Sequence, residues 1–134
     1  MAYPVVPLQP TLGVSEYPNG AVAVNNSSGN KAAATATAML AAAANKTTYI
    51  SGFSITGSGA TAASVVTATV SDGTWTLSYT IAVASGVSAA NQPLIVTFDP
   101  PLPASAVDTT ITVTCPSLGS GNTNNVVNAQ GYQL

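Results

Sequence analysis

The sequence predicts an all-β protein, specifically an antiparallel β-sandwich. In the ten residues Thr74–Val83, larger apolar side chains alternate strictly with polar or small ones. A period of two is typical of a strand with one face toward a core and the other toward water. Asp72-Gly73 separates this run from the alternating run Ser64–Val70, which predicts a tight type I′ hairpin. Further short alternating runs follow turns rich in Gly, Pro and Asn, and this spacing favours a sandwich.

The first thirty residues differ from the rest in their proline and glycine content, so we expect an extended arm at 1–30 and a sandwich domain at 31–134. Prolines recur every third residue early in the arm, which favours a polyproline-like path without ladder pairing. Such an apolar arm can pack on its own domain, reach a neighbouring subunit or partner, or remain a disordered leader. We favour the second reading and expect the arm to serve assembly rather than the fold of its own domain. The side chains expected to make the contact are Tyr3, Val5, Val6 and Leu8.

The next two segments are less clear. A short additional strand is compatible with Ala21–Val24. The run Lys31–Ala44 suits a helix by its alanine content and length. However, Thr35 and Thr37 alternate with alanines, and we therefore favour a strand.

Alternation places the remaining strands, in chain order, at Thr47–Thr56, the two hairpin runs, Leu94–Phe98, Thr110–Cys115 and Asn125–Tyr132. We expect Asp99-Pro100-Pro101 to end the strand before it, because proline cannot donate a ladder hydrogen bond. The final run is expected to be the weakest strand. The total is seven strands, or eight with the segment near residue 21.

The charge content excludes several classes of function. Only 4% of the residues are charged, the net charge is −2, and the chain has no His. Two lysines cannot neutralise a nucleic-acid backbone, and every mechanism that needs imidazole is excluded. A single cysteine forbids an intramolecular disulfide. We see no secretory signal and no apolar run near the roughly 20 residues of a membrane span, so we expect no membrane partner and synthesis in a reducing cytoplasm.

The residues that could support chemistry have simpler explanations. The carboxylates lack the spacing of a glycosidase pair or a calcium loop; they are Glu16, Asp72, Asp99 and Asp108. Cys115 alternates in phase with apolar neighbours and is expected to be a small core residue. Trp75 is a core residue or a sugar-stacking platform, and its apolar in-phase neighbours favour the core. We therefore expect no catalytic residues, no metal, no cofactor and no enzymatic activity.

Three stretches from residue 31 onward carry a family resemblance: TTYISGFSITG, the loop PPLPAS, and the loop LGSGNTN with the terminal GYQL. This part of the chain resembles small jelly-roll proteins encoded among the virion genes of tailed bacteriophages. The resemblance implies a TNF-like jelly roll of seven to eight strands. It also implies a protein, commonly trimeric, that decorates or cements a capsid or forms part of a fibre.

We therefore expect a structural virion protein, a capsid decoration or cement protein on the outer capsid surface. It would bind as a homotrimer and bridge capsomers made of the major capsid protein of a phage head. Small uncharged side chains agree with this, because large areas can be buried with little desolvation. The alternative is a receptor- or glycan-binding module of a phage fibre or spike. That alternative calls for exposed aromatic residues in the strand-connecting loops, and GSG, SDG, ASGVSAANQ and SLGSGNTN contain none.

Overall fold

The computed structural model describes residues 17–86 and 92–134, and the arm contacts expected at Tyr3, Val5, Val6 and Leu8 lie outside them. The described chain forms eight β-strands and no helix. The strands are β1 (Val22–Ser27), β2 (Ala36–Leu40), β3 (Thr48–Ser58), β4 (Ser64–Ser71), β5 (Thr76–Val83), β6 (Leu94–Pro103), β7 (Ile111–Cys115) and β8 (Asn124–Gln133).

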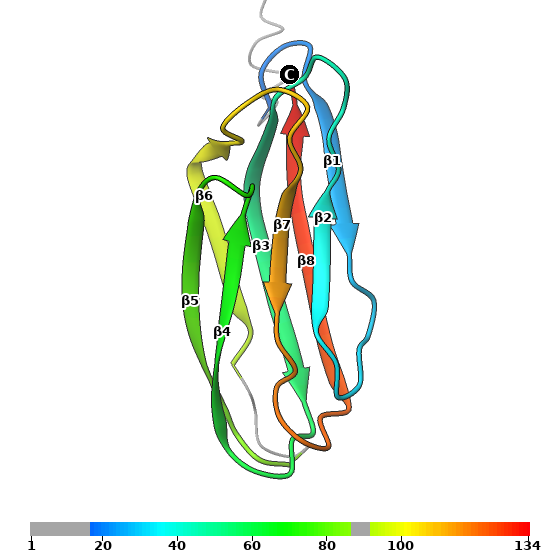
Figure 1. Ribbon diagram of the computed structural model, residues 1–134, viewed down its shortest axis with the longest axis vertical. Coiled ribbons are helices and arrows are strands. Elements are labelled where there is room, and N and C mark those ends of the chain that lie inside the picture. Colours follow the sequence, from blue (N-terminus) through cyan, green and yellow to red (C-terminus); the bar gives the residue numbers. More distant parts are fainter. Residues whose placement is uncertain (1–16, 87–91) are drawn as a thin grey trace, which may run out of the picture.

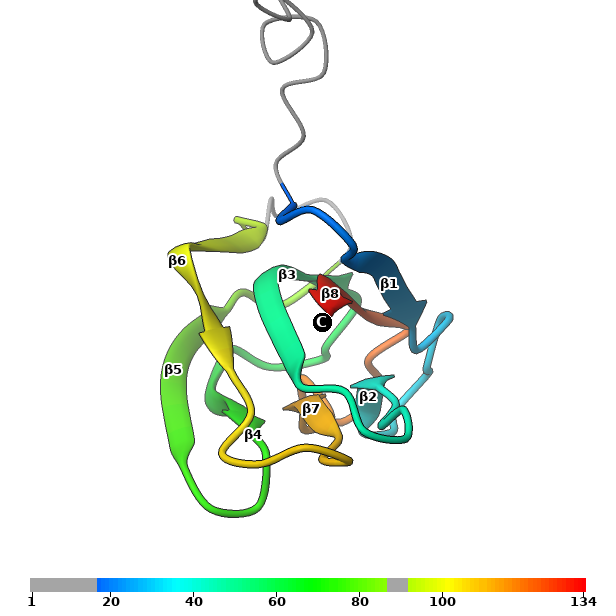
Figure 2. The ribbon, with the colours of Figure 1, turned by 90° about the horizontal axis from the view of Figure 1, so that it is seen from above.

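The strands form two antiparallel sheets that face each other (Figure 1). Sheet A has the order β1-β8-β3-β6, and sheet B has the order β2-β7-β4-β5. The predicted β-sandwich is therefore confirmed. The pairs β1·β8, β2·β7, β3·β6 and β4·β5 are nested about the β4–β5 hairpin. Consequently β5 and β6 are the edges on one side of the sandwich, and β1 and β2 are the edges on the other (Figure 2).

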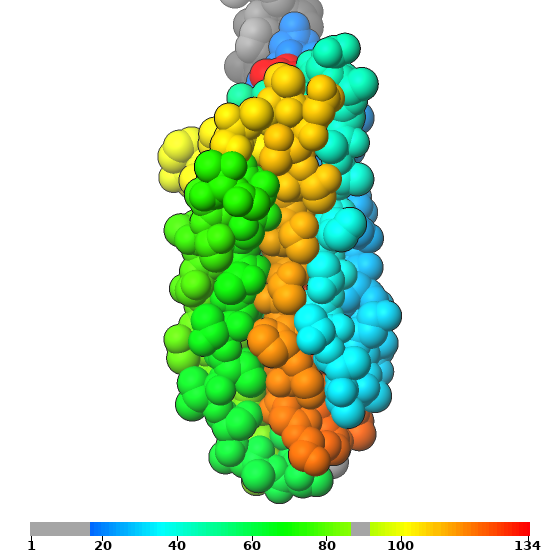
Figure 3. Space-filling view, in the orientation of Figure 1, coloured from blue at the N-terminus to red at the C-terminus, as the bar shows by residue number. Residues whose placement is uncertain are grey.

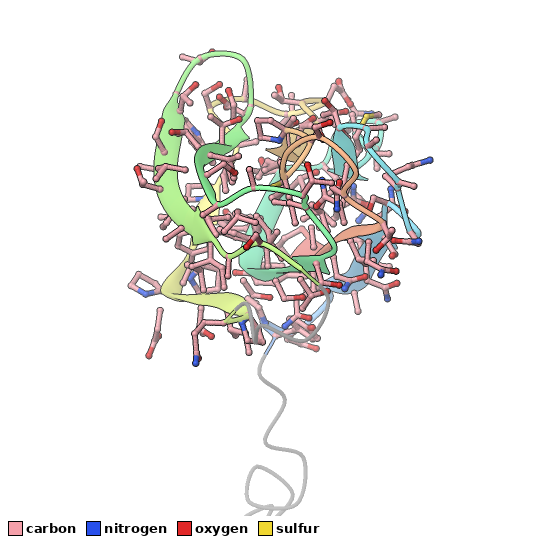
Figure 4. The ribbon with its side chains drawn as sticks, turned by 90° about the horizontal axis from the view of Figure 1, so that it is seen from below. Carbon is pink, nitrogen blue, oxygen red and sulfur yellow. The ribbon has the colours of Figure 1, made fainter. Side chains whose placement is uncertain are left out.

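The hydrophobic core fills the space between the sheets, where side chains from both layers meet (Figure 4). Alternation along each strand sends every second side chain inward, as the sequence predicts. The largest fully buried apolar side chains come from five strands and are Leu40, Ile50, Val70, Ile111, Val113 and Val127. Cys115 is completely buried, as expected from its phase in β7.

Strand β8 occupies a different position from the one expected of a weak terminal strand. It pairs with β1 on one side and with β3 on the other, so it is central in sheet A. Apart from Val127, its inward positions hold small or amide residues, namely Asn125, Ala129, Gly131 and Gln133. At Gly131 a Cβ atom would collide with the backbone carbonyl of Tyr49. The polar composition of this segment predicted a weak strand, although the strand is central in its sheet.

The hairpin between β4 and β5 is present, but its turn is displaced from the predicted Asp72-Gly73 centre. The amide of Asp72 donates to the carbonyl of Trp75 at 3.3 Å, so Gly73 and Thr74 are the central residues. Among these turn residues only Gly73 has a positive φ, +92°, which is the pattern of a type II′ turn rather than type I′. Asp72 instead acts through its side chain, because its Oδ1 accepts the amides of Thr74 and Trp75.

Two other predicted boundaries need correction. The prolines do not end β6: pairing with β3 stops after Thr97 and resumes at Leu102, so residues 98–101 form an unpaired bulge in a continuous edge strand. In the run Lys31–Ala44, only Ala36–Leu40 is a strand. The residues before β2 are held in a loop by hydrogen bonds from backbone amides to the carbonyls of Asn122 and Asn125.

Candidate association surface

One side of the sandwich is lined by apolar side chains that the fold covers only in part. We call it the β5–β6 side. Of the partly buried hydrophobic residues that pack against the core in the described chain, only Val24 and Val66 lie elsewhere. The others, on or next to β5 and β6, are Trp75, Tyr79, Ile81, Leu94, Val96, Phe98 and Leu102. The core is therefore open along this side.

Aromatic rings connect the interior to the β5–β6 side. Phe53 of β3 is only 3% exposed and lies in the core. Its ring meets that of Tyr79 edge-on at 5.2 Å and that of Phe98 at 6.1 Å. Aromatic pairs at these separations are favourable beyond their area burial. The three rings form a rigid apolar layer whose outer members reach the surface.

Apolar side chains with a larger exposed fraction lie on the same two strands. Ile95 of β6 is 72% exposed and Leu77 of β5 is 37% exposed. A groove of about 470 Å³ runs between the end of β5 and the start of β6 and includes Ile81, Val83 and Leu94 in its lining. Ile95 alternates with the half-buried Leu94 and Val96, so it faces outward from sheet A at the edge of this side. Exposed apolar surface of this kind is typical of contacts with other molecules.

Strand β5 also differs from the other edge strands in how its free edge is protected. It has eight residues without a charge, a proline or a bulge. By contrast, β6 carries Asp99, prolines and a bulge, and β2 has only five residues. The second half of β1, Asn25–Ser27, is polar, and the Asn26 amide donates across the sandwich to the carbonyl of Met39 at 2.9 Å. Edges left without such devices are templates for pairing with another chain.

The charged residues of the described chain lie almost entirely off the strands. Four of them are in loops or turns: Lys31, Lys46, Asp72 and Asp108. Asp99 lies in the bulge of β6. The outer face of sheet B, where β4, β7 and β2 lie side by side in Figure 3, carries threonines and serines at paired positions. Both sheets thus present broad uncharged outer faces.

A second groove lies on the outer face of sheet A, near the first described residues. Tyr17 meets Tyr132 of β8 edge-on at 5.4 Å, and Tyr132 stacks on Tyr49 of β3 at 4.8 Å. Burial, and secondarily the neighbouring Tyr49, raises the pKa of Tyr132. Beside this stack is a groove of about 320 Å³, lined by Tyr17, Ser51, Thr97, Phe98, Asp99, Pro101 and Gln130. This groove could not be predicted from the sequence, because its residues are distant along the chain.

Glu16 lies outside the described residues, and the structure does not bring the other candidates, Cys115, Asp72, Asp99 and Asp108, together in one site. Burial raises the pKa of the Cys115 thiol to about 11, while Asn125 opposes this shift, so the group is a buried thiol at neutral pH. Burial also acts to raise the pKa of Asp72. Hydrogen bonds from Ser105, Trp75 and Thr74 outweigh that effect and hold this pKa well below its usual range. In the part of the chain that the structure describes, no group of three His, Cys, Asp or Glu side chains is placed to bind a metal. The same residues include no helix long and apolar enough to cross a membrane.

Trp75 is half-buried at the β5–β6 side rather than enclosed in the core. Its ring packs against the core from the edge, because β5 has a neighbouring strand on one side only. The in-phase pattern identified the correct face of the strand. It did not reveal that the strand is at an edge.

Comparison of the chain with protein-family models and with curated protein sequences finds no match.

Proposed function

We propose that the chain is a structural protein that associates through its β5–β6 side into a homotrimer and, in that form, decorates the outer surface of a phage capsid. The observation that carries this proposal is the concentration of half-buried aromatic and aliphatic side chains on one side of the sandwich. A second chain placed there would complete the core. It would also cover the unprotected edge of β5.

We infer further that the sandwich is a jelly roll. The nested pairing of β1 with β8, β2 with β7, β3 with β6 and β4 with β5 supports this assignment. Such nesting is what results when one long antiparallel hairpin is wound into two facing four-stranded sheets, as in jelly rolls. The fold by itself does not imply a function, and the functional argument rests on the surface.

A trimer needs a heterologous contact, in which the β5–β6 side of one subunit meets a different surface of the next. The outer face of sheet A suits this second role, because its central strands carry short uncharged side chains there. These are Ser51, Ser54 and Thr56 of β3, with Val126 and Asn128 of β8. Burying such groups costs little desolvation compared with burying charges.

The capsid as the partner of the trimer rests on the resemblance to phage virion proteins. Three modest contacts on one rigid trimer sum to tight binding, so no single strong site is required on each subunit. Because the faces are uncharged, binding to the major capsid protein should depend weakly on salt. We expect occupancy to fall less than tenfold between about 50 and 500 mM salt.

The self-association is tested by charging the β5–β6 side. Ile95→Lys replaces an exposed side chain and should leave the fold intact while converting the trimer to monomer in sedimentation equilibrium at micromolar concentration. The matched control is Val22→Lys on β1, an apolar position 53% exposed on the opposite side, which should remain trimeric. Wild-type protein that sediments as a monomer, or equal effects of the two substitutions, would overturn the proposed trimer contact.

The capsid role needs a separate measurement. Purified protein is added to phage heads that lack it and the mixture is sedimented. We expect wild type and Val22→Lys to co-sediment with the heads and Ile95→Lys to remain in solution. If the trimer forms but binds an immobilised glycan and not the heads, the fibre or spike alternative replaces this proposal.

A further inference from the structure

The groove beside Tyr17 combines features that suit an extended, proline-rich chain. The aromatic residues Tyr17 and Phe98 and the proline Pro101 contribute to its lining. Gln130 and Thr97 add an amide and a hydroxyl at the same groove. Proline-rich segments dock in aromatic-lined grooves, and side-chain donors there hydrogen-bond the backbone carbonyls that a polyproline helix leaves unpaired.

The chain itself contains such a segment. Residues 4–10 read PVVPLQP, with proline at every third position. A polyproline helix has three residues per turn, so Pro4, Pro7 and Pro10 would share one edge of it. The segment carries no charge and lies a few residues before Tyr17, at which the described chain begins on the rim of the groove.

We propose that residues 4–10 of one subunit bind in the Tyr17 groove of a neighbouring subunit. This inference rests on the proposed trimer. The groove includes residues 97–101 of β6 and therefore borders the β5–β6 side, where the neighbour would be. The residues between Pro10 and Tyr17 span at most about 23 Å when extended, and this length limits how far from Tyr17 the segment can bind. The segment would then act as a clamp between subunits.

Cross-linking of full-length chains tests the proposal. One chain carries Gln9→Cys and the other carries Thr97→Cys, and after subunit exchange they are treated with a short bismaleimide. The native Cys115 is buried, which keeps its background reaction low. We expect a cross-linked pair containing one chain of each kind, about tenfold more abundant than when Asn25→Cys, on an exposed position of β1, replaces Thr97→Cys.

The prolines provide a second control. Replacing all three in the Gln9→Cys chain (Pro4→Ala, Pro7→Ala and Pro10→Ala) should lower the yield about tenfold, whereas Thr11→Ala should not. Sedimentation of the same samples separates the two proposals. A trimer with no cross-link above the Asn25→Cys control overturns this inference alone, and a wild-type monomer overturns the trimer as well. A third sample, a chain that carries both Gln9→Cys and Thr97→Cys, tests the remaining possibility. A cross-link that forms within this chain but not between the two singly substituted chains places the segment on its own subunit and also overturns the inference.

Discussion

The β1–β2 side of the sandwich is closed by the chain itself, whereas the β5–β6 side is left half-open. On the closed side β1 and β2 approach each other closely, and Ala36 and Ala38 are completely buried. Side-chain amides bridge the two sheets there: Asn26 donates to the carbonyl of Met39, and Gln133 donates to the carbonyl of Ala41 at 2.6 Å. On the other side β5 and β6 scarcely approach each other.

The contrast follows from side-chain size and hydrogen bonding. Small residues allow two sheets to approach until polar groups can bond across the gap. Aromatic rings such as those of Tyr79 and Phe98 keep the edges apart and remain partly exposed. One side therefore completes its own core, and the other has apolar surface that a second chain can cover. The following predictions, from the largest expected effect to the smallest, test this difference.

The largest effect is expected from truncation on the closed side. Leu40→Ala on β2 removes a side chain that is 1% exposed and should lower the free energy of unfolding by about 2–5 kcal/mol. Ile81→Ala on β5 removes a half-buried side chain, so at concentrations low enough to separate subunits it should cost about half as much. Urea titration measures both. Equal losses in the dilute protein would show that the two sides are equally closed.

An intermediate effect is expected when a bridging amide is removed. Gln133→Ala leaves the carbonyl of Ala41 and the hydroxyl of Thr48 without this donor in a buried setting, at a cost of about 1–3 kcal/mol. Asn124→Ala, which removes an exposed amide at the start of the same strand, serves as the comparison and should cost about 0.5 kcal/mol or less. Sedimentation should show the same oligomeric state for both variants. Dissociation of Gln133→Ala would assign the amide to assembly instead of closure.

Trp75 should report on the open side. A tryptophan enclosed in the core would cost about 3–5 kcal/mol on truncation, but the half-buried ring should cost about 1–2 kcal/mol when Trp75→Ala is unfolded at low concentration. As the only tryptophan in the chain, it also provides a fluorescence signal. Its emission should shift to shorter wavelength as concentration rises and subunits associate. Emission independent of concentration across the association range would exclude Trp75 from the contact.

The smallest effect concerns the hairpin at the end of the β5–β6 side. Because the fold lowers the pKa of Asp72, the ionised form is favoured in the folded state, and its contribution to stability is fully present above the ordinary carboxylate pKa near 4. That contribution is lost progressively as the pH falls below this value. Wild type should therefore lose stability from pH 5 to pH 2 more steeply than Asp72→Asn, in thermal unfolding at each pH. Parallel pH profiles would show that the hydrogen bonds from Ser105, Thr74 and Trp75 do not favour the ionised carboxylate.

Much of the strand layout could be predicted from the sequence because alternation is a local property. Five strands match their predicted runs to within two residues at each end, namely β3, β4, β5, β7 and β8, and β1 lies close to its predicted run. The predictions that were wrong concern features that depend on the neighbouring strands as well as on the local pattern. Asp72-Gly73 indicated a turn but not its centre, and the prolines of β6 indicated a break that an edge strand accommodates as a bulge.

The candidate surface was harder to predict. The arm residues singled out from composition lie outside the described chain. The residues that form the open side were recognised only as members of inward-facing patterns. Their exposure depends on the number of strands beside them, and an alternating run looks the same at an edge and in the middle of a sheet.

The sequence by itself determined that this chain is a nearly uncharged β protein, where most of its strands lie, and which face of each strand points inward. Those properties depend on residues two positions apart. The tertiary structure alone decided that the polar final strand is central, that β5 is an unprotected edge, and that Tyr17 meets Tyr132 beside a groove. Many of the runs share the same alternation of Ala, Val and Thr with Ser, so local pattern cannot choose partners among them. Strand order follows instead from long-range packing, from close approaches such as that of Gly131 to Tyr49, and from side-chain amides that bridge the two sheets at the β1–β2 side.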